Sequence, residues 1–336
     1  MADTGVCFTS IAVGTTLGGI ILATIVGNIL VVVAVSSNRV LHTVSNIFIV
    51  SLSLADLLVG TVVMIPAMLN EIYGRWILAP EFCSIWVSFD VMLTSASILN
   101  VSLISFDRYL VIMRPLRYKS LMSTTKALVL LSVIWFIAIM ASFLPIENGW
   151  HYMEATLENL TANSDTPQCI FVVSLPFAAT VSSLTILLPI LISFTLYYRI
   201  SKEANRQFCL LRMLATPGNV LLGMQKVPSK TVRETFTRKA TITLGIIVGA
   251  YVLTWAPFLT ANIVEVFCRC VPPKVFKVFV WLGYCNSLVN PIIYPLFMRD
   301  FRKVYFRFLF FCFPFLKALK KYERGHSERH VNIPIK

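Results

Sequence analysis

Charged residues are scarce in this chain. Only 13% of its 336 residues are Asp, Glu, Lys or Arg, whereas 57% are hydrophobic. A soluble domain carries about a quarter charged residues and slightly under half apolar ones. The deficit of charge excludes an ordinary soluble domain. Together with a mean hydropathy of +0.77, it predicts a protein that crosses a membrane several times.

Seven apolar segments stand out, each near or above the ~20 residues that a helix needs to span a bilayer. They lie within residues 4–38, 43–70, 84–106, 127–146, 169–198, 241–264 and 278–298. The first segment is too long for the apolar core of a cleaved signal peptide, so we interpret it as a retained span. The expected fold class is an all-α membrane protein, a seven-transmembrane helix bundle.

The residues that usually build metal and catalytic centres are also few. The chain has four histidines, and its eight cysteines form no CxxC pair and show no zinc-binding spacing. The apolar segments hold no paired acids and no His–Ser arrangement at a common depth. We therefore expect that the protein is not an enzyme and has no His- or Cys-based metal centre.

The basic residues fall unevenly between the loops. If the N-terminus is extracellular, the loops on that side hold only four of the 29 Lys and Arg residues, namely Arg75, Arg269, Lys274 and Lys277. Positively charged loops stay on the cytoplasmic side of a membrane. We therefore expect a multi-pass plasma-membrane protein with its N-terminus outside. The net charge of +13 then faces anionic inner-leaflet lipid, so nucleic acid is not needed as a partner.

One charge interrupts the third segment. A carboxylate on a membrane-spanning helix costs roughly 2.5–3.5 kcal/mol on insertion scales, so Asp90 marks a functional site whose natural partner is a cation. The triplet Asp107-Arg108-Tyr109 follows roughly 25 Å further along the helix, at about 1.5 Å per residue. A cation acceptor near one membrane face and a charged triplet at the other indicate a receptor.

Each of the seven segments also carries a motif. In chain order the motifs are Asn28, Asp56, Asp107-Arg108-Tyr109, Trp135, Pro189, Thr254-Trp255-Ala256-Pro257 and Asn290-Pro291-Ile292-Ile293-Tyr294. Together they resemble the rhodopsin-like G-protein-coupled receptors over nearly the whole chain. Asp90 with Trp281 and Tyr284 resembles the aminergic branch, and stretches such as YGRW and WLGYCNS resemble its serotonin type-6 group.

The resemblance implies a cell-surface receptor for a protonated biogenic amine, serotonin first, that raises cAMP through the heterotrimeric G protein Gs. A receptor for a different amine, such as a trace amine, tyramine, octopamine or dopamine, is the alternative. Two other classes fit less well. Residues 278–298 contain no Lys to hold the retinal of a light sensor, and an odd span count without an inverted repeat argues against a transporter.

The resemblance places an amine site around Asp90. The carboxylate would pair with the ammonium group and accept a hydrogen bond from Tyr284. Aromatic side chains three residues apart on one helical face, Trp255 and Phe258, would wall the amine. The full ligand-binding set is Asp90, Val91, Thr94, Val181, Ser182, Thr185, Trp255, Phe258, Leu259, Asn262, Trp281 and Tyr284.

Several alternatives stay open at this site. Asp90 could be a structural acid paired with another side chain, although no Lys or Arg lies in any of the seven segments. Ser182 and Thr185 share a face at about 100° per residue, but their hydroxyls could bond their own helix backbone instead of a ligand. Leu259 stands where most aminergic receptors have a Phe, so the ligand preference of this chain could differ from that of its relatives.

Two further polar sites follow from the resemblance. One is an allosteric sodium pocket formed by Asp56, Ser97, Asn286 and Asn290. A water-filled polar network without an ion is the alternative, and no other cofactor is expected. The second is a G-protein switch formed by Asp107, Arg108, Tyr109, Asn290, Pro291 and Tyr294.

Covalent features are expected on the outer side. The resemblance implies a disulfide between Cys83 and Cys169. A local bridge between Cys268 and Cys270 stays open, because the spacing is tight. The loop between the fourth and fifth segments contains a glycosylation sequon at Asn159.

Basic residues interleaved with aromatic ones follow the last span and predict a short amphipathic helix in the membrane interface at 299–312. The receptor domain then covers residues 1–312, and residues 313–336 form a cytoplasmic tail. Cys312 is either palmitoylated or an unmodified buried thiol.

The inner end of the sixth segment predicts measurable basal signalling. In many relatives an acid at that end bonds Arg108 and locks the inactive state. This chain has Thr237 there, and its nearest acid, Glu234, lies one turn earlier. Without a strong lock, cells that express the chain should contain more cAMP than mock-transfected cells when no ligand is added. Equal cAMP in the two cell populations would count against this prediction.

Overall fold

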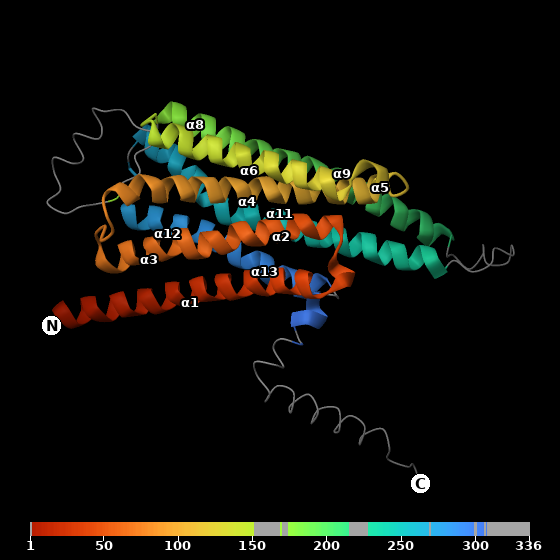
Figure 1. Ribbon diagram of the computed structural model, residues 1–336, viewed down its shortest axis with the longest axis horizontal. Helices are drawn as coiled ribbons and strands as arrows, with labels where there is room; N and C mark the ends of the chain where they lie inside the picture. Colours follow the sequence, from red (N-terminus) through yellow and green to blue (C-terminus); the bar gives the residue numbers. More distant parts are fainter. Residues whose placement is uncertain are drawn as a thin grey trace, which may run out of the picture.

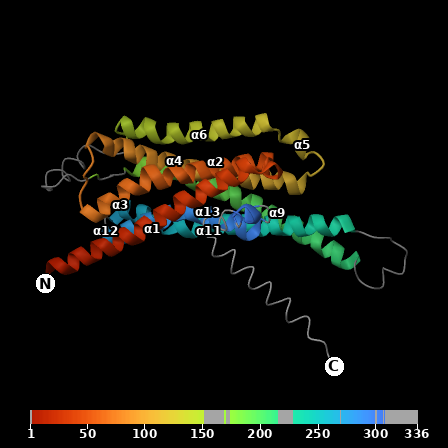
Figure 2. The same ribbon diagram turned by 60° about the horizontal axis from the view of Figure 1, so that its bottom comes forward.

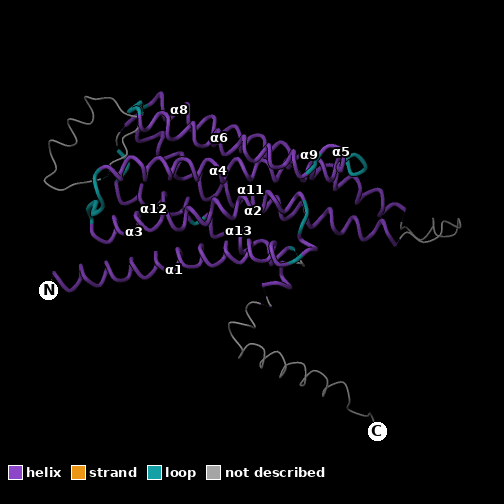
Figure 3. The backbone as a smooth tube through the Cα atoms, viewed as in Figure 1, coloured by secondary structure: helices purple, strands orange, loops and turns teal. Residues whose placement is uncertain are grey.

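The computed structural model describes residues 2–150, 169, 174–214, 228–268, 270–298, 301–305 and 307. Within those ranges every regular element is a helix, as the backbone tube in Figure 3 shows. The helices are α1 (Ala2–Ser37), η1 (Arg39–Leu41), α2 (Val44–Leu58), η2 (Val59–Val63), α3 (Met64–Tyr73), α4 (Glu81–Met113), α5 (Tyr118–Leu121), α6 (Thr124–Glu147), α8 (Leu175–Ser182), η3 (Ser183–Leu187), α9 (Leu188–Leu214), α11 (Pro228–Cys268), α12 (Pro273–Tyr284) and α13 (Asn286–Phe297). The short element η1 is a 3₁₀ turn, whereas η2 and η3 are π-helical.

The long helices lie side by side along one common direction, and their connections lie at the two ends of the bundle (Figure 1 and Figure 2). The central element is α4, which contacts α2, α6, α9 and α11. Its buried face includes small polar residues such as Ser97 and Ser105, which let neighbouring helices approach closely. The predicted helix bundle is therefore confirmed.

Six helical stretches of the described residues are long and apolar enough to cross a membrane. They are Ser10–Ser37, Val44–Tyr73, Glu81–Met113, Thr124–Glu147, Ala179–Gln207 and Thr241–Glu265. The seventh expected span, at 278–298, is not one continuous helix. It consists of α12 and α13, of 12 residues each, which meet at Cys285. In the residues that the structure describes, each of the seven predicted segments is thus mainly helical.

A proline in α13 explains why α1 packs closely against that helix. Pro291 has no backbone N–H to donate to the carbonyl of Ser287, one turn earlier in the helix. The side chain of Asn28 supplies the missing donor, because its Nδ2 lies 3.0 Å from the Ser287 oxygen and 2.9 Å from the Thr24 oxygen. Gly27 permits this approach, since a Cβ there would meet the Pro291 ring at 2.9 Å. A buried amide on α1 therefore completes the backbone bonding of α13.

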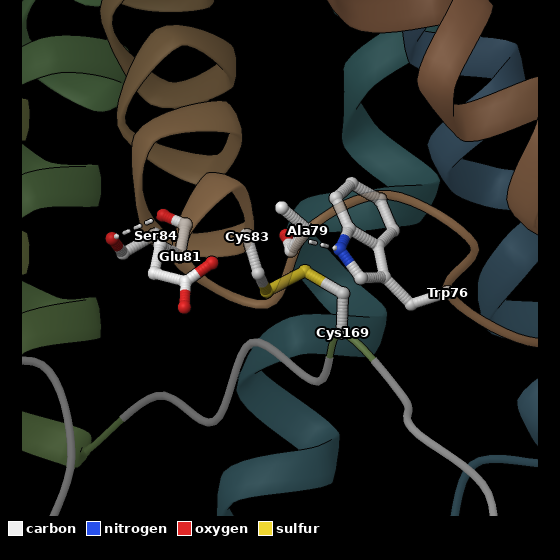
Figure 4. The surroundings of a disulfide bond; sticks show 6 residues. All are labelled: Trp76, Ala79, Glu81, Cys83, Ser84 and Cys169. Atoms are coloured by element: carbon white, nitrogen blue, oxygen red, sulfur yellow. Dashed lines mark hydrogen bonds between the residues drawn. A yellow bond between two sulfur atoms is a disulfide. The ribbon is translucent and has the colours of Figure 1, made fainter.

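Disulfides fix one end of the bundle, which we name the outer end, and the opposite end the inner end, after the orientation that the sequence predicts. Cys83 at the start of α4 is bonded to Cys169, as expected, with the Cα atoms 5.7 Å apart (Figure 4). Beside them, the buried Trp76 indole donates a 3.1 Å hydrogen bond to a carbonyl of its own loop. A second bridge joins Cys268 and Cys270, which resolves the alternative that the sequence left open.

The chain after α13 turns back against α1. Residues 301–305 and 307 are helical, and the fully buried ring of Phe301 packs on Tyr294 with centroids 5.6 Å apart. The hydroxyl of Tyr305 donates a 3.2 Å hydrogen bond to the Gly27 carbonyl. The expected helix at 299–312 is seen only in these residues. Cys312 and the tail at 313–336 lie outside the described residues.

Asn28→Ala should destabilise the bundle. The substitution removes both side-chain hydrogen bonds and leaves the Ser287 carbonyl without its donor in the membrane interior, which costs about 1–3 kcal/mol. We expect a lower thermal midpoint for the purified protein in detergent. Asn205→Ala, on the exposed surface of α9, is the matched control and should leave the midpoint unchanged. Equal midpoints for the two variants would contradict the assigned role of Asn28.

Candidate functional site

The outer site is built on a contact between α4 and α12. The Tyr284 hydroxyl, at the last residue of α12, donates a 2.8 Å hydrogen bond to Oδ2 of Asp90 on α4, as the sequence predicted. Thr94, another member of the predicted set, lies one turn further along α4. Among the described residues, no Lys, Arg or His forms an ion pair with Asp90. Among these residues the carboxylate therefore accepts hydrogen bonds from neutral groups only, and its negative charge has no cationic partner.

Aromatic side chains line the same end of the bundle. Trp255 and Phe258 on α11 meet edge to face with ring centroids 5.7 Å apart. Phe258 also contacts Phe276 of α12 at 5.5 Å, and Trp281 meets Tyr284 edge to face at 5.6 Å. The sequence analysis missed Phe276. Its distance of eight residues from Tyr284, about two helical turns, places both on one face and is the signal that would have found it.

The aliphatic members of the predicted set pack between helices. Val91 of α4 and Val181 of α8 both pack on a small buried cluster with Phe177. Leu259 packs beside Trp255 in another cluster, with aliphatic residues of α4 and η3. These residues form the walls between α4, α8 and α11 near Asp90.

The hydroxyls of the fifth span are placed differently from one another. Thr185 is only 1% exposed, and its hydroxyl donates a 2.7 Å bond to the Val181 carbonyl of its own span. Backbone bonding, the alternative weighed from the sequence, is therefore what Thr185 does here. Ser182 is half-buried immediately before the π-helical turn η3, which changes the angular spacing of the residues after it. Asn262 is half-buried on α11, one turn beyond Phe258.

A second carboxylate lies deep in the bundle. Asp56 on α2 is 0% exposed and accepts hydrogen bonds from Asn290 Nδ2 at 2.8 Å and from Ser97 Oγ at 3.3 Å. Asn286 is buried on the same helix as Asn290. The buried amide of Asn28 on α1 bonds backbone carbonyls and not this carboxylate. In the part of the chain that the structure describes, no Lys or Arg pairs with Asp56.

The inner site centres on Asp107. Its carboxylate accepts hydrogen bonds from Ser45 Oγ at 2.6 Å and Tyr118 OH at 2.7 Å, and it forms an ion pair with Arg108 at 3.1 Å. Burial, together with its bond to Asp107, raises the pKa of Tyr118 to about 12, so the phenol remains a donor. Tyr109 packs beside the buried inner cluster. The sequence analysis missed Ser45 and Tyr118, which come from other helices.

The remaining switch residues lie on α13. Asn290 holds Asp56, Pro291 packs against α1, and the buried ring of Tyr294 packs on Phe301. The α13 helix thus joins the deep carboxylate to the inner end of the bundle. Asn159 and the side chains of Glu234 and Thr237 lie outside the described residues, so the expectations that rest on them stay predictions.

Comparison with known proteins agrees with the order of the motifs. The family model described as "7 transmembrane receptor (rhodopsin family)" matches residues 27–294. The chain is 45% identical to 5-hydroxytryptamine receptor 6 of Rattus norvegicus, over 83% of this chain and 66% of that receptor. It is 34% identical to Dopamine receptor 1 of Drosophila melanogaster, over 89% and 62% of the two chains. For the Octopamine receptor beta-1R of the same fly, the identity is 36% over 93% and 64%.

The aligned part of the chain therefore spans just under two thirds of the length of these relatives. The family match covers all seven segments apart from residues 4–26 of the first and 295–298 of the seventh. It includes the last part of the helix Ser10–Ser37 and the whole of the other five helices that are long enough to cross a membrane. The chain belongs to the rhodopsin family of seven-transmembrane receptors, and it is a multi-pass membrane protein and not an enzyme.

Proposed function

We propose that the protein is a cell-surface receptor for a protonated biogenic amine, most specifically serotonin, and that it raises cAMP through Gs. The observation that carries this proposal is the Asp90 carboxylate, which is oriented by Tyr284 and has no cationic partner among the described residues. Serotonin is favoured because the rat 5-hydroxytryptamine receptor is 45% identical to this chain, against 34% and 36% for the dopamine and octopamine receptors.

The amine binds through its positive charge. Its ammonium group donates a charge-assisted hydrogen bond to Asp90, which is stronger in a low-dielectric site than a bond between neutral groups. Tyr284 holds one carboxylate oxygen, so the other faces the ligand. The rings of Trp255 and Phe258 add cation–π and apolar contacts to the aromatic part of the amine.

Binding is transmitted along α11. Below Phe258, Trp255 stacks on Tyr251 with centroids 6.2 Å apart. The Trp255 ring also lies against Gly283 of α12, where a Cβ would meet it at 3.1 Å. A ligand that presses on these rings changes the contact between α11 and α12. It shifts the bundle toward an open form only by the difference between its affinities for the two forms.

The G protein binds at the opposite end. Arg108 forms an ion pair with Asp107, and in the proposed mechanism opening of the inner end frees its guanidinium for the partner. Asn290, Pro291 and Tyr294 lie on the helix that joins the deep polar site to this end. We expect these three residues to shift when the inner end opens.

A different amine is the alternative ligand. Leu259 contributes an aliphatic wall where most aminergic receptors have an aromatic one, and the Thr185 hydroxyl is engaged by its own helix. Both features could favour a trace amine, tyramine, octopamine or dopamine over serotonin. The receptor would keep Asp90 as the acceptor in each case.

The disulfides support an extracellular N-terminus. The start of α4 and the end of α11 lie at the end of the bundle where the chain begins (Figure 1). Cys83 of the Cys83–Cys169 bridge is in the first turn of α4, and Cys268 of the Cys268–Cys270 bridge is the last residue of α11. Disulfides persist in oxidising compartments. The plasma membrane is the proposed location. Glycosylation of Asn159 on this side and palmitoylation of Cys312 on the other are proposed from the sequence alone.

Asp56 is proposed to bind an allosteric sodium ion. Its buried carboxylate lacks a cationic partner in the described part of the chain, and the side-chain oxygens of Ser97, Asn286 and Asn290 belong to the same buried region. Oxygen ligands of this kind suit a hard cation. When bound, the ion supplies positive charge to the carboxylate, and it stabilises the closed bundle.

The amine proposal predicts a serotonin response that depends on Asp90. Cells expressing the full chain are dosed with serotonin, tyramine, octopamine, dopamine or simple diamines, and cAMP is measured. Serotonin should raise cAMP, and Asp90→Asn should abolish the response because the ammonium loses its counter-charge. A response to another amine that is also abolished would keep the site and change the ligand. A response that survives Asp90→Asn would refute the pairing mechanism.

A conservative pair of variants sharpens this test. Tyr284→Phe removes only the hydroxyl that orients Asp90. Loss of a hydrogen bond to a charged group should lower the potency of serotonin by about tenfold. Tyr198→Phe, at a tyrosine 62% exposed on α9, should change nothing.

The sodium proposal predicts a cation effect on agonist affinity. In membranes from cells expressing the chain, replacing choline chloride with sodium chloride should weaken agonist binding by at least about fivefold, because sodium stabilises the closed form. Asp56→Asn should remove the difference between the two salts. Equal affinities in both salts for the unmodified receptor would favour a water-filled network without an ion.

A further inference from the structure

Two glycines of α11 have different surroundings. An ideal Cβ built on Gly245 would lie 2.7 Å from both Cε2 and OH of Tyr197 on α9 and 2.8 Å from its Cζ. Real Cβ atoms do not approach other atoms so closely, so the Tyr197 ring rests directly on the α11 backbone. At Gly249, one turn further along the same helix, a Cβ would have no neighbour within 4 Å. Of these two glycines, only Gly245 lies where an added Cβ would overlap a neighbouring side chain.

The Tyr197 ring packs against a buried cluster at the inner end of the bundle. Around it, Leu244, Ile247 and Val248 of α11 are buried in one cluster with Ile200 of α9. The same cluster includes residues of α4 near Arg108, as well as Tyr294 of α13. The contact between α9 and α11 is therefore part of the packing that closes the end where the switch residues lie.

We propose that Gly245 is a positioning residue that seats the Tyr197 ring and thereby holds the inner end of α11 against α9. The contact exists only while the two backbones are close, because the ring fills the space that a side chain at position 245 would occupy. Movement of α11 away from α9 releases it. This inference rests on the proposed function, in which opening of the inner end admits a G protein.

The inference predicts that Gly245→Ala opens the receptor. The added methyl overlaps the ring, and overpacking of this kind disfavours the packed arrangement. Basal signalling in cells expressing the full chain should rise by about tenfold at equal surface expression. Gly249→Ala makes the same chemical change with the same gain in helix propensity, and it should leave basal signalling unchanged.

A structural reporter makes the result independent of the G protein. Cys209 on α9 is an exposed free thiol beyond the contact, and a fluorophore on it reports movement at the inner end. Cys209→Ser provides the background label. The emission of purified Gly245→Ala should differ from that of the unmodified receptor without ligand, whereas Gly249→Ala should match it. A shifted emission without a response from any G-protein class would refute the coupling proposal and leave the seat intact.

The ring itself provides the decisive comparison. In a Tyr197→Ala background the methyl has space, so Gly245→Ala/Tyr197→Ala should equal Tyr197→Ala alone in basal signalling and in emission. An effect of Gly245→Ala that persists in this background would overturn the proposal, as would identical behaviour of Gly245→Ala and Gly249→Ala. If Gly245→Ala does not reach the cell surface, Tyr197→Leu tests the same seat. It should shift the Cys209 emission, and an unshifted emission would overturn the proposal.

Discussion

One missing backbone hydrogen bond shapes the centre of this receptor. Pro291 cannot donate to the Ser287 carbonyl, and in lipid no water is available to replace that donor. Asn28 on α1 restores the bond, and Gly27 gives α1 the space to approach. One residue before the proline, Asn290 donates to Asp56. The packing of α1, α2 and α13 thus follows from the need to satisfy buried polar groups around one proline.

The need to satisfy buried polar groups also distinguishes the two carboxylates of α4, Asp107 and Asp90. Asp107 is saturated, because two hydroxyls and the guanidinium of Arg108 bond it. It therefore anchors this end of α4. Asp90 accepts a bond from the neutral Tyr284 hydroxyl and is half-buried, and no Lys, Arg or His of the described residues pairs with it. We therefore assign Asp90 to the proposed amine site and Asp107 to the proposed G-protein switch.

Rings that rest on glycines connect these two ends. Trp255 lies against Gly283 of α12, and Tyr197 lies against Gly245 of α11. In each contact a flat ring fills the space that a side chain at the glycine would occupy. The two helices therefore either stay in contact or separate, with few arrangements between these two. Packed interfaces of this kind favour two discrete arrangements over gradual deformation. Such contacts suit a receptor whose ligand selects between a closed and an open bundle.

The sequence by itself determined the seven segments and the motif that each carries, because apolar runs and short motifs are local features. It also predicted the bond from Tyr284 to Asp90, the residue that we propose as the amine acceptor. Only the tertiary structure decided the break at Cys285, the bonds of Ser45 and Tyr118 to Asp107, and the seat at Gly245. These three features depend on which side chains of separate helices meet. Lipid-facing helices lack clear polar and apolar faces, so the sequence alone does not predict which side chains meet.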